Sequence, residues 1–319
     1  MALAVACSNG AEAVRAVGLR PGGYLYLVNA GTNDVDVLDA VSLELIRTVP
    51  VGQVPSDIVL SPVGNRAFVI SPTDSAVTVI DTRTAQTVGR PIAVATYPTA
   101  AVASPDGRTL YVACGETDDI RAYEVDSGRR DGPPIKVGNA PGGLAMSPDG
   151  RRLYVTSEYQ NDVRTIDIAT WSVLGDPIQV GLFPTGIAVN RSGDRVFVAS
   201  SYSDTISVID TLSGVVIRQQ EFVGSYPANI MISPDDQRLY VANRKSGTVS
   251  VVDPVSLREI AVVGTGQAPS ALTISEDGRA VYVANMFSNS VSVIDSVIPH
   301  VERQAAIGSS PRGIALEVL

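Results

Sequence analysis

The segment LYVANRKSGTVSVVD, residues 239–253, contains two short apolar stretches on either side of a polar turn. Neither stretch alternates cleanly between apolar and polar residues, as a strand with one solvent-exposed face does. Two near-copies of it are VYVANMFSNSVSVID at 281–295 and LYVTSEYQNDVRTID at 153–167. The segment is therefore one copy of a repeat, and the fold must bury both faces of its strands.

Alignment of the chain with itself reveals seven copies, each marked by three positions. An aromatic residue of the first stretch recurs every 42 or 43 residues, at Tyr26, Phe68, Tyr111, Tyr154, Phe197, Tyr240 and Tyr282. A proline keeps the same step, at Pro55, Pro98, Pro141, Pro184, Pro227, Pro269 and Pro311. A carboxylate closes the second stretch, at Asp39, Asp81, Glu124, Asp167, Asp210, Asp253 and Asp295. The constant spacing predicts seven structural units of one kind.

Each unit is expected to contain four strands, which in the sixth copy begin near residues 229, 238, 248 and 258. The turn SPDG at 104–107 and 147–150 separates the first two strands, and SPVG, NRSG, SPDD and SEDG replace it in other copies. Clusters of Pro, Asp and Gly are typical of tight turns, so we interpret these residues as scaffold. Four antiparallel strands in about 40 residues are typical of a propeller blade, whose middle strands lie between two neighbouring blades.

The repeat begins at a second strand, YLYLVN at 24–29, and finishes with a first strand, GIALEVL at 313–319. The sequence therefore predicts an all-β, seven-bladed β-propeller over residues 24–319. The C-terminal strand is expected to join the N-terminal blade as its innermost strand and so to close the ring. Residues 1–23 are expected to form an arm outside the repeat, or an extra outer strand at AVRAVG.

The motifs LYVAN and VYVAN, each followed by VSVVD or VSVID, resemble those of the YVTN family of β-propeller repeat proteins. The resemblance covers about residues 24–319 and implies the propeller fold. Members of this family are commonly bacterial or archaeal, often at or outside the cell surface, and many are binding or interaction modules. Related propellers include lactonase-like and lyase-like enzymes, so the resemblance leaves both functional classes open.

Composition and charge narrow the range of partners. Hydrophobic residues make up 45% and charged residues 18% of the chain, and no apolar run has the length of a membrane-spanning helix. The net charge of −9 opposes a surface that binds nucleic acid, which needs clustered Lys and Arg. We therefore expect a monomer without nucleic-acid partner or transmembrane segment.

The first ten residues, MALAVACSNG, resemble the tail of a lipoprotein signal that ends at Cys7, but they lack a charged start and a full apolar region. The compartment stays open on this evidence: cytoplasmic if Met1 is the true start, an extracytoplasmic lipoprotein if the start is truncated. Two cysteines do not define a disulfide framework.

A ligand site is expected at the end of the ring that carries the proline loops and the loops between second and third strands. The residue before each proline is Val54, Tyr97, Ala140, Phe183, Tyr226, Ala268 or Ser310. The third residue of the other loop is Gly31, Thr73, Glu116, Tyr159, Tyr202, Lys245 or Phe287. These two sets hold six of the 17 aromatic residues, and aromatics rimmed by polar groups are typical of ligand pockets and protein interfaces. The alternative is that they pack one loop against another.

Acidic residues accompany these aromatics, namely Glu116, Asp118, Asp119, Glu158 and Asp162. Paired carboxylates can perform acid–base chemistry if their environments separate their pKa values, but in a chain this negative we favour the interpretation that they are solvated acidic loops. His300 is the only histidine and is expected in an outer strand, which removes histidine-based zinc or triad chemistry. Cys114 is interpreted as a small filler, because no base is placed to activate it.

The sequence thus predicts a non-catalytic binding propeller for a small-molecule ligand or protein partner, without cofactor or metal. Its predicted ligand-binding residues are Tyr97, Glu116, Glu158, Tyr159, Phe183, Tyr202, Tyr226, Lys245 and Phe287. The alternative is a lyase, cyclase or lactonase-like enzyme that uses carboxylates and tyrosines at the tunnel mouth. No catalytic residue is assigned.

Overall fold

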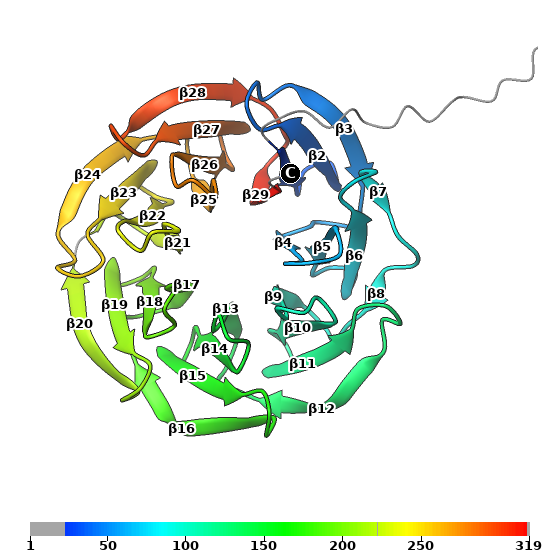
Figure 1. The fold of residues 1–319 in the computed structure, drawn as a ribbon, viewed down its shortest axis with the longest axis vertical. Coiled ribbons are helices and arrows are strands. Elements are labelled where there is room, and N and C mark those ends of the chain that lie inside the picture. The colour runs from blue at the N-terminus through cyan, green and yellow to red at the C-terminus, as the bar shows by residue number, and fades with distance from the viewer. Residues whose placement is uncertain (1–22, 222, 318–319) are drawn as a thin grey trace, which may run out of the picture.

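The computed structural model describes residues 23–221 and 223–317, which form seven antiparallel sheets arranged as a ring around a central axis (Figure 1). The described residues contain strands and no helix, and therefore no helix that could span a membrane. The predicted seven-bladed β-propeller is confirmed. The extra strand proposed at AVRAVG lies outside the described residues. We number the blades in chain order from the blade that contains Tyr24.

The innermost strands surround the axis, and the second and third strands contain most of the buried residues. From blade 1 to blade 7, the innermost strands are β29 (Pro311–Glu317), β4 (Asp57–Leu60), β9 (Pro98–Ala103), β13 (Pro141–Met146), β17 (Pro184–Val189), β21 (Pro227–Ile232) and β25 (Pro269–Ile274). The second strands are β1 (Tyr24–Asn29), β5 (Arg66–Ser71), β10 (Thr109–Cys114), β14 (Arg152–Ser157), β18 (Arg195–Ser200), β22 (Leu239–Asn243) and β26 (Ala280–Asn285).

The third and outermost strands complete each blade. The third strands are β2 (Asp34–Asp39), β6 (Ala76–Asp81), β11 (Asp119–Glu124), β15 (Asp162–Asp167), β19 (Thr205–Asp210), β23 (Thr248–Val252) and β27 (Ser290–Asp295). The outermost strands are β3 (Leu45–Pro50), β7 (Gln86–Thr87), β8 (Ile92–Ala93), β12 (Arg130–Lys136), β16 (Ser172–Gln179), β20 (Val215–Glu221), β24 (Glu259–Gly264) and β28 (His300–Ala306). In blade 2 this position is split between β7 and β8, which both pair with β6 around Pro91.

The repeated aromatic residue of the second strand connects each blade to the next. Tyr240 of blade 6 packs against Val281 and Val283 of blade 7. Phe197 of blade 5 packs in the same way against Leu239 of blade 6, and equivalent buried clusters lie at the other five junctions. The middle strands are therefore apolar on both faces because each face contacts a neighbouring blade.

Blade 1 closes the ring because β29 pairs antiparallel with β1, with Tyr26 opposite Ala315 and Tyr24 opposite Glu317. The Tyr26 hydroxyl lies 2.9 Å from the Thr82 carbonyl oxygen and 3.1 Å from a Glu317 carboxylate oxygen. The Thr82 hydroxyl donates to the other Glu317 oxygen. One buried polar cluster therefore joins the C-terminal strand to blades 1 and 2.

We expect that removing residues 313–319 unfolds or aggregates the protein, because the deletion exposes the backbone edge of β1 and the apolar faces around Tyr26. Circular dichroism melts and size-exclusion chromatography would measure this. Removing residues 1–12 is the control and is expected to be tolerated. A 313–319 deletion that melts within a few degrees of the full chain would contradict this role of β29.

Candidate ligand-binding site

The proline loops and the loops between second and third strands lie at the same end of the ring and bind one another. We call this end the proline face. The residue before each proline has a left-handed backbone, with φ between 47° and 60°, at Val54, Tyr97, Ala140, Phe183, Tyr226, Ala268 and Ser310. Most residues other than glycine avoid this region, so an opposing interaction must hold it.

That interaction is a hydrogen bond that the backbone N–H donates to a side chain of the preceding blade. The backbone N–H of Phe183 donates to the side-chain oxygen of Asn161 at 2.8 Å, and that of Tyr226 donates to Asp204 at 2.7 Å. The same contact recurs from Val54 to Asn33, from Ala140 to Asp118, and from Ser310 to Asn289. At five of its seven loops, the backbone of the proline face is therefore fixed by a side chain of the preceding blade.

Four of the predicted site residues form a continuous row of aromatic rings on blades 4 to 6. Phe183 stacks on Tyr202, with ring centroids 4.3 Å apart and planes 13° apart. The Tyr159 ring packs edge-on against Phe183 with a centroid distance of 5.8 Å. The Tyr226 ring is tilted against Tyr202, also with a centroid distance of 5.8 Å. Tyr159 and Tyr202 remain 70% and 62% exposed. The row thus combines mutual packing with an exposed aromatic surface.

The remaining predicted site residues lie outside this row. Tyr97 is 52% exposed, and its ring packs beside the backbone of Gly115. Phe287 is 64% exposed and has the Arg244 guanidinium 5.9 Å from its ring centroid. Glu116 and Lys245 are exposed, and neither side chain forms a hydrogen bond or ion pair with the described residues. The geometry brings together four of the nine predicted residues and places Glu158 beside them.

Glu158 lies directly over the innermost strand of blade 4. A Cβ atom at Gly142 would come within 2.3 Å of a Glu158 carboxylate oxygen. The Glu158 side chain therefore occupies space that is available only because residue 142 is glycine. Burial raises the pKa of Glu158 to about 7. Burial also raises the pKa of Tyr226, with a smaller contribution from the Glu158 carboxylate that the positive charge of Arg244 opposes. These charges therefore act on the end of the aromatic row.

Arg244 is a site residue that the sequence analysis did not select. It donates to the sulfur of Met286 at 3.1 Å and lies over Phe287. Arg244 and Glu158 occupy equivalent places, directly after the second strand, where the other blades have Ala30, Pro72, Gly115, Ser201 and Met286. Comparing this loop position between the copies would have identified both as the only charged members of the set.

Three of the acidic residues near the aromatics have structural roles, and two of them, Asp119 and Asp162, are buried, so the interpretation of these loops as solvated acidic loops is wrong for those two. Asp118 accepts the Ala140 N–H. Asp119 is buried and forms ion pairs with Arg121 at 2.9 Å and Lys136 at 3.3 Å, and Arg121 holds its pKa below the usual value against the opposing effect of burial. Asp162 is also buried and pairs with Arg164 at 3.4 Å.

The predictions for the lone histidine and for Cys114 agree with the structure. His300 begins β28, an outermost strand, and its Nδ1 lies 2.6 Å from the Ile298 carbonyl oxygen. Cys114 is buried at the end of β10, and burial raises the pKa of its thiol to about 11. A thiol with such a pKa stays protonated and is a poor nucleophile.

Unpaired polar atoms mark the first residues of several innermost strands at this end of the ring. Ser56 Oγ, Asn229 Oδ1 and Arg312 Nε are buried and have no hydrogen-bond partner among the described residues. Burial raises the pKa of the Asp57 carboxyl to about 6, while a 2.8 Å hydrogen bond from its neighbour Ile58 opposes the shift. Buried polar groups are normally satisfied by water or by a ligand.

The sequence of residues 97–254 matches the family described as lactonase, 7-bladed beta-propeller. The match extends over blades 3 to 5 and the first three strands of blade 6. The chain is a β-propeller repeat protein. A comparison with curated protein sequences gives no match.

Several solved structures share the fold. A functionally unknown protein from Desulfotomaculum acetoxidans DSM 771 superposes with a TM-score of 0.78 at 17% identity, over 92% of this chain and 98% of that one. Dihydro-heme d1 dehydrogenase NirN in complex with DHE gives 0.70 at 15% identity, over 93% and 75%. Kuenenia stuttgartiensis hydrazine synthase gives 0.56 at 22% identity, over 76% and 96%. At such identities the likeness shows the fold alone.

Because burial raises the pKa of Glu158 from 4.5 to about 7, the folded protein binds an additional proton between these values. The free energy of unfolding contributed by this group therefore falls as pH rises through that window. We expect Glu158→Gln to raise the free energy of unfolding at pH 8 by about 1 kcal/mol, a value reduced for solvent screening, with a smaller gain at pH 5. Urea unfolding at both pH values would measure it.

Glu116→Gln is the matched control, because Glu116 is exposed in the neighbouring loop. Its effect on the free energy of unfolding should be small at both pH values. An equal gain at pH 5 and pH 8 for Glu158→Gln would contradict a burial-raised pKa.

Metal dependence can be tested separately. Within residues 23–221 and 223–317, no three His, Cys, Asp or Glu side chains are grouped as a metal site would require. We expect EDTA to leave the melting temperature unchanged, since metal binding and folding are coupled only where fixed ligands exist. A drop in melting temperature that Ca²⁺ reverses would show that the acidic loops bind a cation.

Proposed function

We propose that this propeller binds a small-molecule ligand or a protein partner through the proline face of blades 4 to 6, without catalysis. The row of Tyr159, Phe183, Tyr202 and Tyr226 carries the proposal. Aromatic side chains contribute large contact areas and lose little conformational entropy on binding, so they dominate many interfaces. Here the rings already support one another, which leaves less disorder to remove when a partner binds.

The polar surroundings of the row support a ligand with a polar or charged group beside an apolar or planar body. Arg244 offers a cation, Glu158 a carboxyl group that changes charge near neutral pH, and Asn229 an unpaired amide oxygen at the innermost strand of blade 6. A few polar groups around an apolar surface are the usual composition of ligand sites. We also propose, from the LYVAN and VSVID motifs, that the chain is of the YVTN type.

A second candidate function is a lactonase-like hydrolase or related acid–base enzyme. The observation that favours it is Glu158, whose pKa of about 7 suits proton transfer at physiological pH and which lies beside the Tyr226 ring system. The family match over residues 97–254 includes the loop that carries this residue. The second carboxyl group with a raised pKa, Asp57, is on blade 2.

A screen of small metabolites that includes lactones, observed by ligand NMR, would test the binding proposal. We expect that compounds bound by the wild-type protein lose roughly 1 to 4 kcal/mol of affinity in Tyr202→Ala and in Tyr159→Ala, with little change in folding. Leu212→Ala is the control, because Leu212 is an exposed apolar residue on a turn at the opposite end of the ring.

Two outcomes would decide against the proposal. If the bound compounds keep their affinity in both tyrosine variants, the working surface lies elsewhere. If the protein hydrolyses a lactone, and Glu158→Gln abolishes turnover while binding persists, the protein is an enzyme and the non-catalytic proposal is wrong.

A further inference from the structure

The opposite end of the ring is built from the SPDG-type turns that join the innermost and second strands. We call this end the turn face. The second residue of the turn is proline in blades 2, 3, 4 and 6, and in blades 3, 4 and 6 it packs beside the glycine of the turn in the next blade. A Cβ atom at Gly150 would lie 2.9 Å from the Pro105 ring, and one at Gly193 would lie 3.2 Å from Pro148. The turns therefore interlock around the axis.

Three residues depart from this pattern, and all three line one cavity. Arg191 of blade 5 and Glu276 of blade 7 replace the proline of the turn, and Asp236 of blade 6 replaces the glycine. Asp236 keeps the left-handed backbone of that glycine, with φ of 58°, at a position where a side chain is disfavoured. Departures from a scaffold motif that converge on one place point to a role other than scaffolding.

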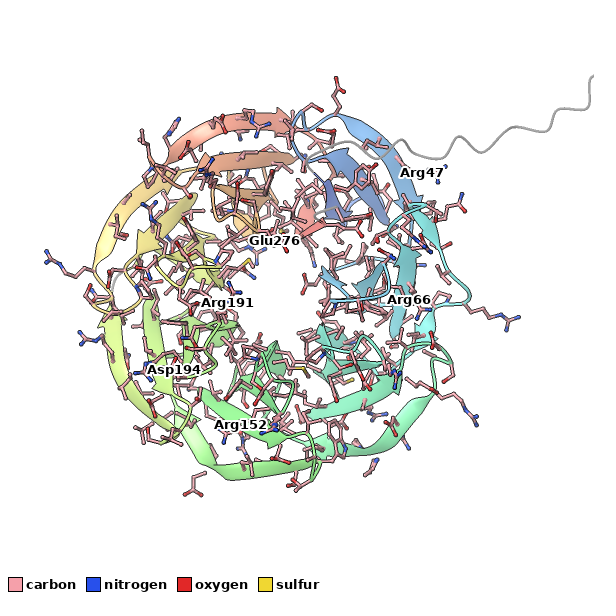
Figure 2. The ribbon with its side chains drawn as sticks, viewed as in Figure 1. Arg47, Arg66, Arg152, Arg191, Asp194 and Glu276 are labelled. Carbon is pink, nitrogen blue, oxygen red and sulfur yellow. The ribbon has the colours of Figure 1, made fainter. Side chains whose placement is uncertain are left out.

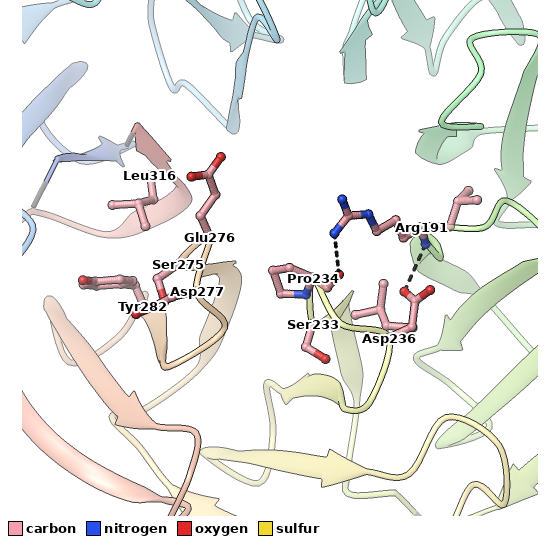
Figure 3. Close-up of a pocket in the computed structure, with 11 residues that line it drawn as sticks. Arg191, Ser233, Pro234, Asp236, Ser275, Glu276, Asp277, Tyr282 and Leu316 are labelled. Carbon is pink, nitrogen blue, oxygen red and sulfur yellow. Dashed lines mark hydrogen bonds between the residues drawn. The ribbon is translucent and has the colours of Figure 1, made fainter. Parts of the chain in front are cut away.

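The cavity has a volume of about 900 Å³, which is within the usual range for small-molecule sites. Its apolar walls include Val189, Ile232 and Leu316, from the ends of β17, β21 and β29. Arg191 and Glu276 lie near the ring axis in Figure 2, whereas Arg47 lies at the outer strands. Figure 3 shows the Arg191 guanidinium and the Glu276 carboxylate pointing into the open space from opposite sides.

Most polar groups of this cavity are already paired. Asp236 accepts the backbone N–H of Arg191 at 3.0 Å, Asp277 accepts the hydroxyl of Ser275 at 2.6 Å, and the Tyr282 hydroxyl donates to a carbonyl oxygen of blade 1 at 3.0 Å. The turn geometry and the walls are therefore fixed by internal contacts.

Two charged groups remain available. The Arg191 guanidinium has one long contact of 3.5 Å, with the Pro234 carbonyl oxygen. Glu276 forms no hydrogen bond or ion pair with the part of the chain that the structure describes, and the two side chains do not pair with each other. The cavity thus combines apolar walls with one cation and one carboxylate, Arg191 and Glu276, that lie on opposite sides and have no close partner among the described residues, while the Asp236 and Asp277 carboxylates are engaged within the turns.

We infer that the turn face binds a small zwitterion with an apolar body, whose ammonium and carboxylate groups are several bonds apart, as in a short apolar peptide. The ligand carboxylate would accept hydrogen bonds from Arg191, whose planar guanidinium binds carboxylates in bidentate fashion. The ligand ammonium would donate to Glu276, and the apolar body would contact Val189, Ile232 and Leu316. This site is separate from the proline face and does not depend on the function proposed there.

Isothermal titration calorimetry with the dipeptide leucyl-leucine tests this inference. We expect leucyl-leucine to bind, and N-acetyl-leucyl-leucine and leucyl-leucinamide to bind roughly ten-fold or more weakly, because each lacks one of the two charges. Glu276→Pro converts the turn of blade 7 into SPDG, the sequence found in blades 3 and 4, so it should fold well. This variant should weaken the binding of leucyl-leucine roughly ten-fold. It should not weaken the binding of N-acetyl-leucyl-leucine further, because that peptide has no ammonium group.

Arg191→Gln should weaken the binding of leucyl-leucine to a similar extent and leave the affinity for leucyl-leucinamide, which has no carboxylate, unchanged. Glu276→Gln serves as a second variant that keeps the backbone of the turn, and Tyr202→Ala should leave binding of leucyl-leucine unchanged because it alters the other end. The inference is overturned if leucyl-leucine does not bind at millimolar concentration. It is also overturned if Arg191→Gln and both Glu276 variants keep wild-type affinity.

Discussion

The packing of one aromatic residue per blade against the next blade is the interaction on which the rest of this structure depends. Each blade alone would expose two apolar faces, so no blade is stable without both neighbours. The closed ring covers the apolar faces of all seven blades, and this requires that the last junction between blades also forms. Junctions such as Tyr240 with Val281 therefore stabilise one cooperative body, and the pairing of β29 with β1 completes it.

A second repeated interaction fixes the loops of the proline face. The N–H groups of Phe183 and Tyr226 are held by Asn161 and Asp204 of the preceding blades, in a backbone conformation that large aromatic residues rarely adopt. The strain at these positions is offset by the hydrogen bond. As a result the loops present aromatic rings from a fixed backbone, so the chemistry of the face can vary while its geometry stays constant.

The fold was predictable because its determinants are periodic. A single step of 42 or 43 residues fixed the number of blades, the buried aromatics and the closing strand. The site was predictable only in part. Counting aromatics located Tyr159, Phe183, Tyr202 and Tyr226 on one face, but that they form a row follows only from the folded structure. The acidic loops looked alike in sequence, whereas burial distinguishes Glu158 from Asp118, which is bound to the scaffold. Arg244 was overlooked because its loop position was not compared between the copies, and its contacts with Met286 and Phe287 of the next blade are visible only in the structure.

The outermost strands have a consequence for the behaviour of the protein at high concentration. Prolines interrupt or lie within these strands in blades 2, 3 and 4, at Pro91 and in β12 and β16, and a residue without an N–H cannot extend a sheet. The strands β20, β24 and β28 contain none, and Val215 and Ile260 among them are half exposed. Blades 5 to 7 therefore present the least protected sheet edges, and self-association through intermolecular strand pairing would begin on that side of the ring.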